Sequence, residues 1–453
     1  MRRSRFSVPN NWRFGFALLL LATCVVLGGC SREPEYDLLF AEDSPPVTLT
    51  YISPNSPLIS EPEAVAIERF RELAPGIEID RQTFQLSLSD YLLDTPPPDV
   101  ILMVAGNELV NAGDSGLLSD LSDVWLEGNF AEAYGQPFQD LSRIDGAIRF
   151  VPAGFTYTGV YYNKEVFERY GLTPPANWEE FEQICDTLLT YGETPMSLAG
   201  QNPFTSVLWF DYLNLRLNGP DFHRDLMAGL ISFEDERVGR VWQLWNSLLD
   251  RDYFVESPGS TSELASLTAL IRGDAQSPLN REKAVMALAP HFSLAQLPPA
   301  FASELGFFQF PQMDAKLPTG EVSIAFGYVI PAGAPNRLQA GKFVGFLGSA
   351  EAQELQLRRI GEDESNVGYV PVHGDFNRSL LSPTAAKGDQ IVRSSSSISP
   401  PMLLVLPSSM GGRFEQVLRR LFPAISNRIQ VAEIQSMLEE ARQTAIRNGE
   451  FGQ

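Results

Sequence analysis

The chain has 453 residues, with 34 Lys and Arg against 56 Asp and Glu, and its formal net charge is −22 at pH 7. Four of the basic residues lie in the first thirty positions, which hold no acidic residue, so the remainder carries −26. A surface this acidic repels phosphate backbones and anionic headgroups, which disfavours nucleic-acid binding and electrostatic attachment to a membrane.

The amino terminus has the pattern of a secretion signal. Four arginines precede an apolar run from Phe14 to Leu27, shorter than the roughly 20 residues that span a bilayer. The run ends in Leu27-Gly28-Gly29-Cys30, which resembles a bacterial lipobox. We therefore expect cleavage before Cys30 and lipidation of its thiol, since two acyl chains give stable anchoring. A plain signal peptide with an incidental cysteine is the alternative.

The acidic segment from Ser31 to Pro46 contains prolines and little periodic pattern, and it predicts a tether between the anchor and the body. No later segment is long and apolar enough to cross a bilayer. Besides Cys30, the mature chain keeps only Cys185, which leaves no internal disulfide. We expect a membrane-anchored lipoprotein of the cell envelope that faces the periplasm or the cell exterior.

The body of roughly 400 residues is large enough for two or three domains and begins with a mixed α/β pattern. Val47–Ile52 has strand composition, and Glu61–Leu73 has apolar residues at helical spacing. Ile77–Asp80 follows Pro75-Gly76 as a second strand. This strand–helix–strand order is the unit of a parallel sheet.

The near-continuous apolar run Asp99–Ala105 predicts a central strand covered on both faces. A helix is expected from there toward Gly113. In open α/β sheets, ligands lie at the carboxyl ends of strands. Gly106 and Asn107, directly after the run, are therefore candidate ligand-binding residues, with a tight turn as the alternative.

Further elements alternate along the rest of the chain. Helical patterns cover Trp178–Tyr191, Arg237–Asp250, Gln339–Leu347, Ala350–Ile360 and Val431–Asn448, and strand patterns cover Val160–Tyr162, Ala284–Leu288, Leu305–Phe310 and Val322–Ile330. The serine run Ser394–Ser399, followed by two prolines, predicts an exposed loop.

The stretch from Val151 to Phe181 carries an ordered string of short motifs. They are Val151-Pro152, Val160-Tyr161-Tyr162-Asn163-Lys164-Glu165-Val166-Phe167, Tyr170-Gly171-Leu172, Pro174-Pro175 and Asn177-Trp178-Glu179-Glu180-Phe181. The string closely resembles the signature of family 1 extracellular solute-binding proteins, the maltodextrin-binding type. Asn177 stands where the family usually has threonine, and asparagine also caps helices well.

Other blocks resemble the same family in the same order. They are Phe70 to Ile77, Pro98-Asp99-Val100 with Gly116-Leu117-Leu118, Ala284 to Ala287, Gly306 to Pro311, Phe326 to Pro331, Ala340 to Leu347 and Ala350 to Gln353. The resemblance covers nearly the whole mature chain.

The resemblance implies a two-lobe, periplasmic-binding-protein-like α/β fold of type II, with discontinuous lobes joined by a hinge. The first lobe is expected to hold residues 47–153 and 323–372, and the second to hold residues 154–322 and 373–453. A small solute, in this family often a carbohydrate, would lie between the lobes and favour closure. Expected partners are ABC permease subunits in the membrane, with no cofactor and a monomeric binding protein.

The resemblance and the chemistry of sugars together select candidate ligand residues. Aromatic rings suit the apolar faces of a sugar, and carboxylates and amides suit its hydroxyls. Phe204, Trp209 and Asp211 follow a Gly200 break where the family places an aromatic residue. Thr156 and Tyr157 are expected at the crossing between the lobes. Core packing is the alternative for the aromatic residues.

His291 occupies the position at which the resemblance implies a stacking tryptophan. Either His291 and Phe292 share that role, or the solute is not a typical glucoside. A histidine satisfied at a strand end is the alternative. The remaining candidates, on weaker grounds, are Asn55 and Ser56 after the first strand, Tyr328, and Phe414 in a glycine-rich turn.

Enzymatic functions find no support in the sequence. The three histidines lie far apart, and no metal-binding, nucleophile-elbow or phosphate-loop motif is present. We expect a non-enzymatic, lipid-anchored component of an ABC importer that binds a sugar or oligosaccharide. Two alternatives remain open, a binder of a polyamine, peptide or phosphodiester, and an envelope scaffold or sensor lipoprotein.

Overall fold

The structure, a computed structural model, describes residues 46–55, 57–85, 88–271, 283–360, 368–422 and 428–451. All of them lie in the unit formed by residues 44–453. The expected signal, Cys30 and the tether lie outside the described residues, as does Ser56.

The first part of the chain contains β1 (Val47–Ser53), α1 (Pro57–Leu73), β2 (Ile77–Thr83), α2 (Leu88–Leu93), β3 (Val100–Val104), α3 (Asn107–Asp114), α4 (Ser122–Glu127), α5 (Phe130–Ala133), α6 (Gln136–Ser142), β4 (Arg143–Ile144), β5 (Ala147–Ile148) and β6 (Val151–Asn163). β1 pairs in parallel with both β2 and β3. The expected strand–helix–strand unit and central strand are thus confirmed.

The middle part contains α7 (Lys164–Arg169), α8 (Trp178–Thr190), β7 (Met196–Ser197), α9 (Pro203–Met227), α10 (Glu236–Leu249), η2 (Pro258–Ser260), α11 (Glu263–Thr268), β8 (Met286–Pro290), η3 (His291–Gln296), α12 (Pro299–Glu304) and β9 (Leu305–Phe308). Asn163 and Asn177 cap α7 and α8 through their side chains, which accept from Val166 N and Glu180 N. The helix expected over Trp178–Tyr191 is therefore confirmed together with its start.

The last part contains β10 (Gly320–Val329), α13 (Arg337–Gly348), α14 (Ala350–Ile360), β11 (Val370–Pro371), η4 (Arg378–Leu380), α15 (Pro383–Ser394), β12 (Ser397–Ser399), α16 (Met402–Val405), α17 (Ser408–Leu421) and α18 (Val431–Arg447). The loop expected over Ser394–Ser399 is wrong at both ends, since Ser394 is the last residue of α15. Ser397–Ser399 forms β12, which pairs in parallel with β10 from Gly320 to Val322 and so satisfies its backbone groups.

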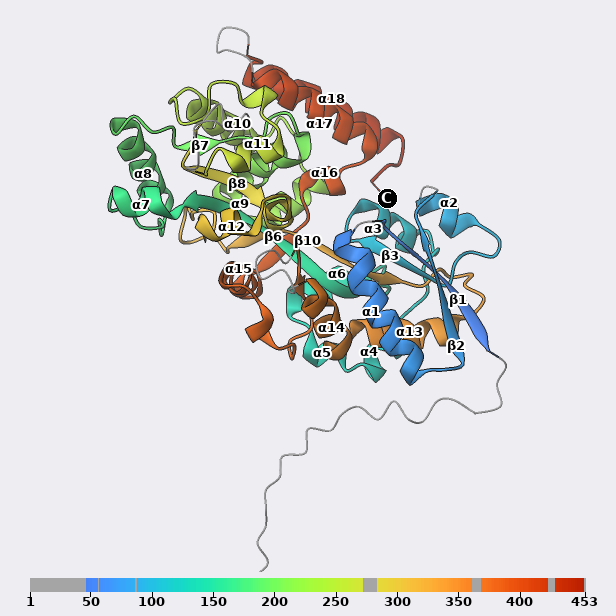
Figure 1. The fold of residues 1–453 in the computed structure, drawn as a ribbon. Coiled ribbons are helices and arrows are strands. Elements are labelled where there is room, and N and C mark those ends of the chain that lie inside the picture. Colours follow the sequence, from blue (N-terminus) through green and yellow to red (C-terminus); the bar gives the residue numbers. More distant parts are fainter. Residues whose placement is uncertain are drawn as a thin grey trace, which may run out of the picture. The chain divides into compact units, whose positions relative to one another are not determined.

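Two long strands connect the halves of the molecule. Within the described residues, ten strands form one sheet in the order β2-β1-β3-β10-β6-β8-β7, with β11 and β9 also paired to β6 and β12 paired to β10. The first half of β6 pairs with β10, and its second half, from Thr158 to Asn163, pairs with β8 and β9. Figure 1 shows β6 and β10 between the two groups of helices and strands.

Buried side chains form two cores, one that fills the first lobe and extends into the second, and one that lies within the second lobe. The first contains Leu49, Ile101 and Phe343, and the second contains Trp209, Trp242 and Phe414. Phe376 and Val392, beyond the boundary expected at residue 373, pack with the first core. The first core also continues along the crossing strands to residues such as Phe307 of β9, so the cores meet at the sheet.

A fully buried ion pair fixes α9 to the crossing strands. Arg216 on α9 donates to the Glu321 carboxylate of β10 at 2.6 Å, and their side chains are 0 % and 1 % exposed. Arg216 also donates to the carbonyls of Phe310 and Gly320. The Tyr212 hydroxyl lies 2.8 Å from Thr158 O of β6 and 3.0 Å from Glu321 Oε2. One helix is thereby held to both crossing strands.

Candidate functional site

A polar cavity lies where two parallel strands of the second lobe end. β7 and β8 run parallel, so their carboxyl ends meet at one edge, where η3 and the loop to α9 begin. The cavity has a volume of about 390 Å³ and is lined by Gln201, Asn202, Pro203, Ser262, Glu263, Leu264 and Gln296. We call it the strand-end cavity.

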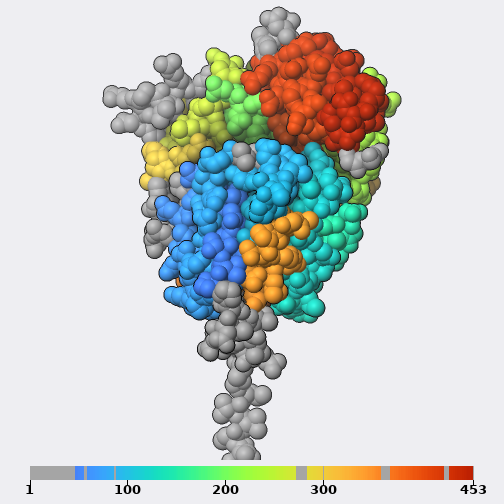
Figure 2. Space-filling view, turned by 90° about the vertical axis from the view of Figure 1, so that its right-hand side faces the viewer, coloured from blue at the N-terminus to red at the C-terminus, as the bar shows by residue number. Residues whose placement is uncertain are grey.

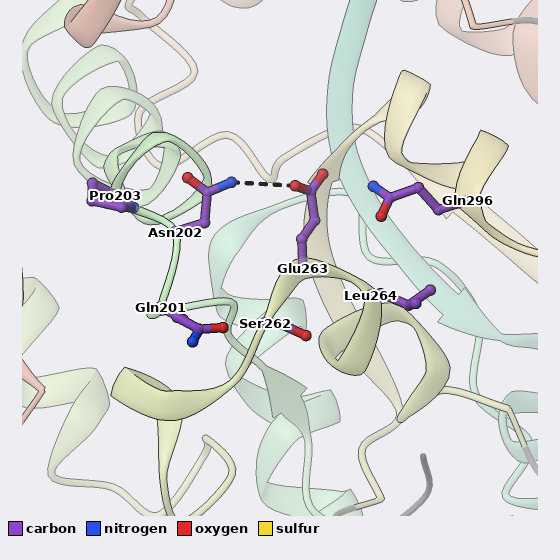
Figure 3. A pocket seen from close by; sticks show the side chains of 7 residues that line it. All are labelled: Gln201, Asn202, Pro203, Ser262, Glu263, Leu264 and Gln296. Carbon is purple, nitrogen blue, oxygen red and sulfur yellow. Dashed lines mark hydrogen bonds between the residues drawn. The ribbon is translucent and has the colours of Figure 1, made fainter.

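The side chains of the strand-end cavity are held by helix caps. Asn202 caps α9, because its Oδ1 accepts from Phe204 N at 3.0 Å. Its Nδ2 donates to Glu263 Oε2 at 3.2 Å, and Ser293 Oγ donates to Glu263 Oε1. Figure 3 shows the Glu263 carboxylate between Asn202 on one side and Gln296 on the other.

The lining of the strand-end cavity suits a neutral, hydroxyl-rich solute. A carboxylate and three amides, those of Gln201, Asn202 and Gln296, supply acceptors and donors. None of the seven lining residues is a lysine or an arginine. A bound anion would therefore meet Glu263 with no compensating cation from that set, and its burial would be costly.

Aromatic rings meet at the crossing beside this edge. Tyr157 of β6 stacks on His291, with ring centroids 4.4 Å apart and planes 16° apart. Phe307 packs edge-on against Tyr157, with ring centroids 5.1 Å apart. The Tyr161 hydroxyl and His291 Nδ1 are hydrogen-bonded at 3.1 Å. Burial raises the pKa of Tyr157 well above its usual value. This stack joins the crossing strand to the end of β8.

The two lobes touch where α3 begins. A Cβ built on Gly106 would lie 2.7 Å from the carbonyl oxygen of Leu404 in α16. Beside this contact is a second cavity of about 590 Å³, lined by residues of both lobes that include Asn107, Asp140 and Arg224. In Figure 2 the C-terminal residues, coloured red, border the blue and teal residues of the first lobe.

Comparison with known proteins identifies the family. The family model of bacterial extracellular solute-binding proteins matches residues 56–354. The chain belongs to this family. Among relatives, an uncharacterised ABC transporter extracellular-binding protein of Pyrococcus horikoshii is 21% identical over 339 residues, 70% of this chain and 72% of that protein. The osmoprotective compounds-binding protein GgtB of Synechocystis is 24% identical, and the match spans 42% of this chain and 47% of GgtB.

Solved structures of solute-binding proteins share the fold. The solute receptor AcbH, described as exclusive for β-D-galactopyranose, superposes with a TM-score of 0.77 at 22% identity, over 88% of this chain and 99% of AcbH. RafE from Streptococcus pneumoniae gives 0.69 at 16% identity, over 89% and 100%. The expected two-lobe fold is confirmed, and the protein is a bacterial extracellular solute-binding protein.

Family membership implies an extracellular or periplasmic location for this solute-binding protein. In the part of the chain that the structure describes, no helix combines the length and the apolar character needed to cross a membrane. Within the same residues, no group of three His, Cys, Asp or Glu side chains is arranged to hold a metal ion.

Four of the expected site residues form two neighbouring pairs in the structure. Gly106 and Asn107 lie at the start of α3 and line the second cavity. Tyr157 and His291 form the aromatic stack. Thr156, on the opposite face of β6 from Tyr157, is 6 % exposed.

Three other expected residues lie near strand ends. Asn55 is exposed after β1. Phe292 is half-buried on η3, next to His291, and Phe204 is half-buried in the first turn of α9, directly after the lining residue Pro203. Phe204 and Phe292 thus come from α9 and η3, two of the three elements that line the strand-end cavity.

Four expected residues lie in the cores. Trp209 packs edge-on against Phe254 and Phe310, with centroids 5.2 and 5.7 Å away. Phe414 packs on Phe210 and Trp242, and Tyr328 on Tyr51. Asp211 is fully buried and accepts from Met402 N. None of these four lines either cavity described above, which for Trp209, Tyr328 and Phe414 favours the alternative of core packing over solute contact.

Sequence reasoning missed Gln201, Asn202, Glu263 and Gln296. The signal for Asn202 was present, because an asparagine before a proline and an apolar run is a helix start. The rule that placed Gly106 after β3 applies equally to Gln201 after β7, but a two-residue strand leaves no readable pattern. Glu263 comes from a separate helix, which one sequence cannot place beside β7.

Proposed function

We propose that this protein is the lipid-anchored substrate-binding component of an ABC importer, and that it takes a neutral sugar or oligosaccharide. The observation that carries the proposal is the strand-end cavity, with one carboxylate, three amides and no cation among its lining residues. Hydroxyl groups both donate and accept, so they match this set. The descriptions of AcbH and RafE, which name galactopyranose and raffinose, support the same class of ligand.

The proposed mechanism is closure of two lobes around the solute. The lobes proposed are residues 47–153 with 323–372 and residues 154–322 with 373–453, connected by the crossing strands. All seven residues that line the strand-end cavity belong to the second lobe, so a solute bound there would gain contacts with the first lobe only on closure and would shift the population toward the closed form. Permease subunits would then recognise that form. No covalent step is needed, and a monomer suffices.

The first test is binding. Titration with D-galactose, raffinose and chitin oligosaccharides, followed by calorimetry and thermal shift, should identify at least one saccharide that binds. Glu263→Gln should weaken its binding about tenfold, because a hydrogen bond to a charged acceptor is replaced by a neutral one. Glu168→Gln, an exposed change on α7, is the matched control and should leave affinity unchanged. Binding of spermidine or a peptide, with no saccharide bound, would contradict the proposal.

The lipid anchor is tested separately. Cys30→Ser should release the protein from membranes into the soluble fraction, because the acyl chains supply the membrane affinity and the acidic body supplies none. Fractionation of cells that express each form measures this. If Cys30→Ser protein still sediments with membranes, the proposed lipobox is wrong.

A further inference from the structure

The contact between α3 and α16 is a direct approach of two backbones. The Leu404 carbonyl lies so close to Gly106 that a methyl group added there would be 2.7 Å from its oxygen. Gly106 has φ 178° and ψ −165°, an extended conformation that alanine also adopts. The glycine is therefore required by the neighbouring lobe and not by its own dihedral angles.

The short helix α16 is held from inside the second lobe by Asp211. The Asp211 carboxylate accepts from the backbone N–H of Met402, the first residue of α16, at 3.1 Å. Asp211 lies on α9, and its side chain is 0 % exposed. An unpaired N–H at a helix start is satisfied in this way by a buried acceptor. The helix that meets Gly106 is thereby tied to the core of the second lobe.

A second buried polar residue stands beside Asp211. His223 Nε2 lies 3.8 Å from Asp211 Oδ1, and its Nδ1 is 2.8 Å from the side-chain nitrogen of Asn214. Desolvation raises the pKa of Asp211 well above its usual value and lowers the pKa of His223 to about 3. Burying two titratable side chains costs free energy, so Asp211 and His223 belong to the packed interior of the lobe and not to a solvated surface.

We propose that Asp211 is a positioning residue, which holds α16 against Gly106 and so stabilises the contact between the lobes. This inference rests on the proposed function in one respect: it assigns the contact between α3 and α16 to the closed form that binds solute. A residue in the core of one lobe then influences α3 of the other lobe. That influence across the junction distinguishes positioning from local stabilisation.

Hydrogen exchange without any solute tests the proposal. Two amides report on the two sides of the contact: Leu406 N donates to Met402 O in α16, and Val110 N donates to Gly106 O in α3. Asp211→Leu removes the acceptor and should raise the hydrogen-exchange rate about fivefold or more at both amides. Losing one hydrogen bond changes an opening equilibrium by about that factor. Asp211→Asn keeps an acceptor oxygen and should behave like the wild type.

Gly106→Ala probes the same contact from the first lobe and leaves the buried core of the second lobe untouched. It should also raise exchange at Leu406 and Val110, because the added methyl forces the backbones apart. Gly412→Ala, in α17, is the matched control, since a Cβ there meets nothing within 4 Å. An exchange rate at Val110 that stays at the wild-type value in Asp211→Leu would overturn the proposal, whatever the result for Gly106→Ala, because Val110 N donates to Gly106 O and senses that substitution directly. Because no solute is present, failure to bind saccharides does not affect this result.

Discussion

Replacing Arg216 by methionine should lower the free energy of unfolding by about 3–5 kcal/mol. The substitution leaves the Glu321 carboxylate, 1 % exposed, without its ion-pair partner. It also removes the donors to the Phe310 and Gly320 carbonyls, while Tyr212 and Gln309 still donate to Glu321. A buried charge that loses its partner costs far more than an exposed one. Chemical denaturation monitored by circular dichroism measures the change.

The control for Arg216 is Arg224, which lies in α9 beyond the kink at Gly219. Arg224 pairs with Asp221 and Asp225, but its side chain is 65 % exposed, so Arg224→Met should cost at most about 1 kcal/mol. The double variant of Arg216→Met with Glu321→Gln should recover part of the loss, because no buried charge remains unpaired. Equal losses for the two single arginine variants would show that the buried pair has no special role.

The periodic parts of the chain could be predicted from the sequence because burial has a simple pattern there. Apolar and polar residues alternate over Ile77–Asp80, which forms part of β2. The nearly continuous apolar run Asp99–Ala105 contains β3. The helix expected over Ala350–Ile360 agrees with α14, which has one buried face. The family motifs between Val151 and Phe181 fall on β6 to α8, where caps and strand pairs fix the backbone.

The helical segment α9 was not predicted, for a physical reason. α9 runs from Pro203 to Met227, and Thr205 to Arg216 are all buried, so no polar stripe marks a helical period. At Gly219, which has φ 81° and precedes Pro220, the backbone is not helical, so α9 is two helices that meet at a kink. Tertiary burial on every side thus hides the element that supplies Asn202, Asp211 and Arg216.

The same burial limited the site prediction. The strand-end rule pointed to the edge after β3, where Gly106 and Asn107 border a cavity, but it could not be applied to the short strand β7. Polar and aromatic residues on an unrecognised helix could not be assigned to a face. Asp211 was therefore expected among sugar hydroxyls, whereas the structure has it accept from Met402 N inside the lobe. Which face a side chain takes depends on contacts that are distant in sequence.

Trp209→Ala should lower the free energy of unfolding by about 3–5 kcal/mol, the usual cost of truncating a buried tryptophan. The indole is 1 % exposed and packs between Phe254 and Phe310 in the second core. Its removal leaves a cavity that the neighbouring rings cannot fill without leaving their own contacts. Denaturant titration of the variant and the wild type measures the loss.

Trp209→Phe separates packing from solute contact. Within the described residues the indole Nε1 has no hydrogen-bond partner, so phenylalanine keeps most of the packing and strands no polar group. We expect a loss below about 2 kcal/mol for this variant, as for other volume-reducing aromatic changes. The affinity of the folded fraction for a bound saccharide should be within about threefold of the wild type in both variants, well under the tenfold that 1.4 kcal/mol represents. A stable Trp209→Ala protein that has lost its saccharide affinity would show instead that the indole contacts the solute.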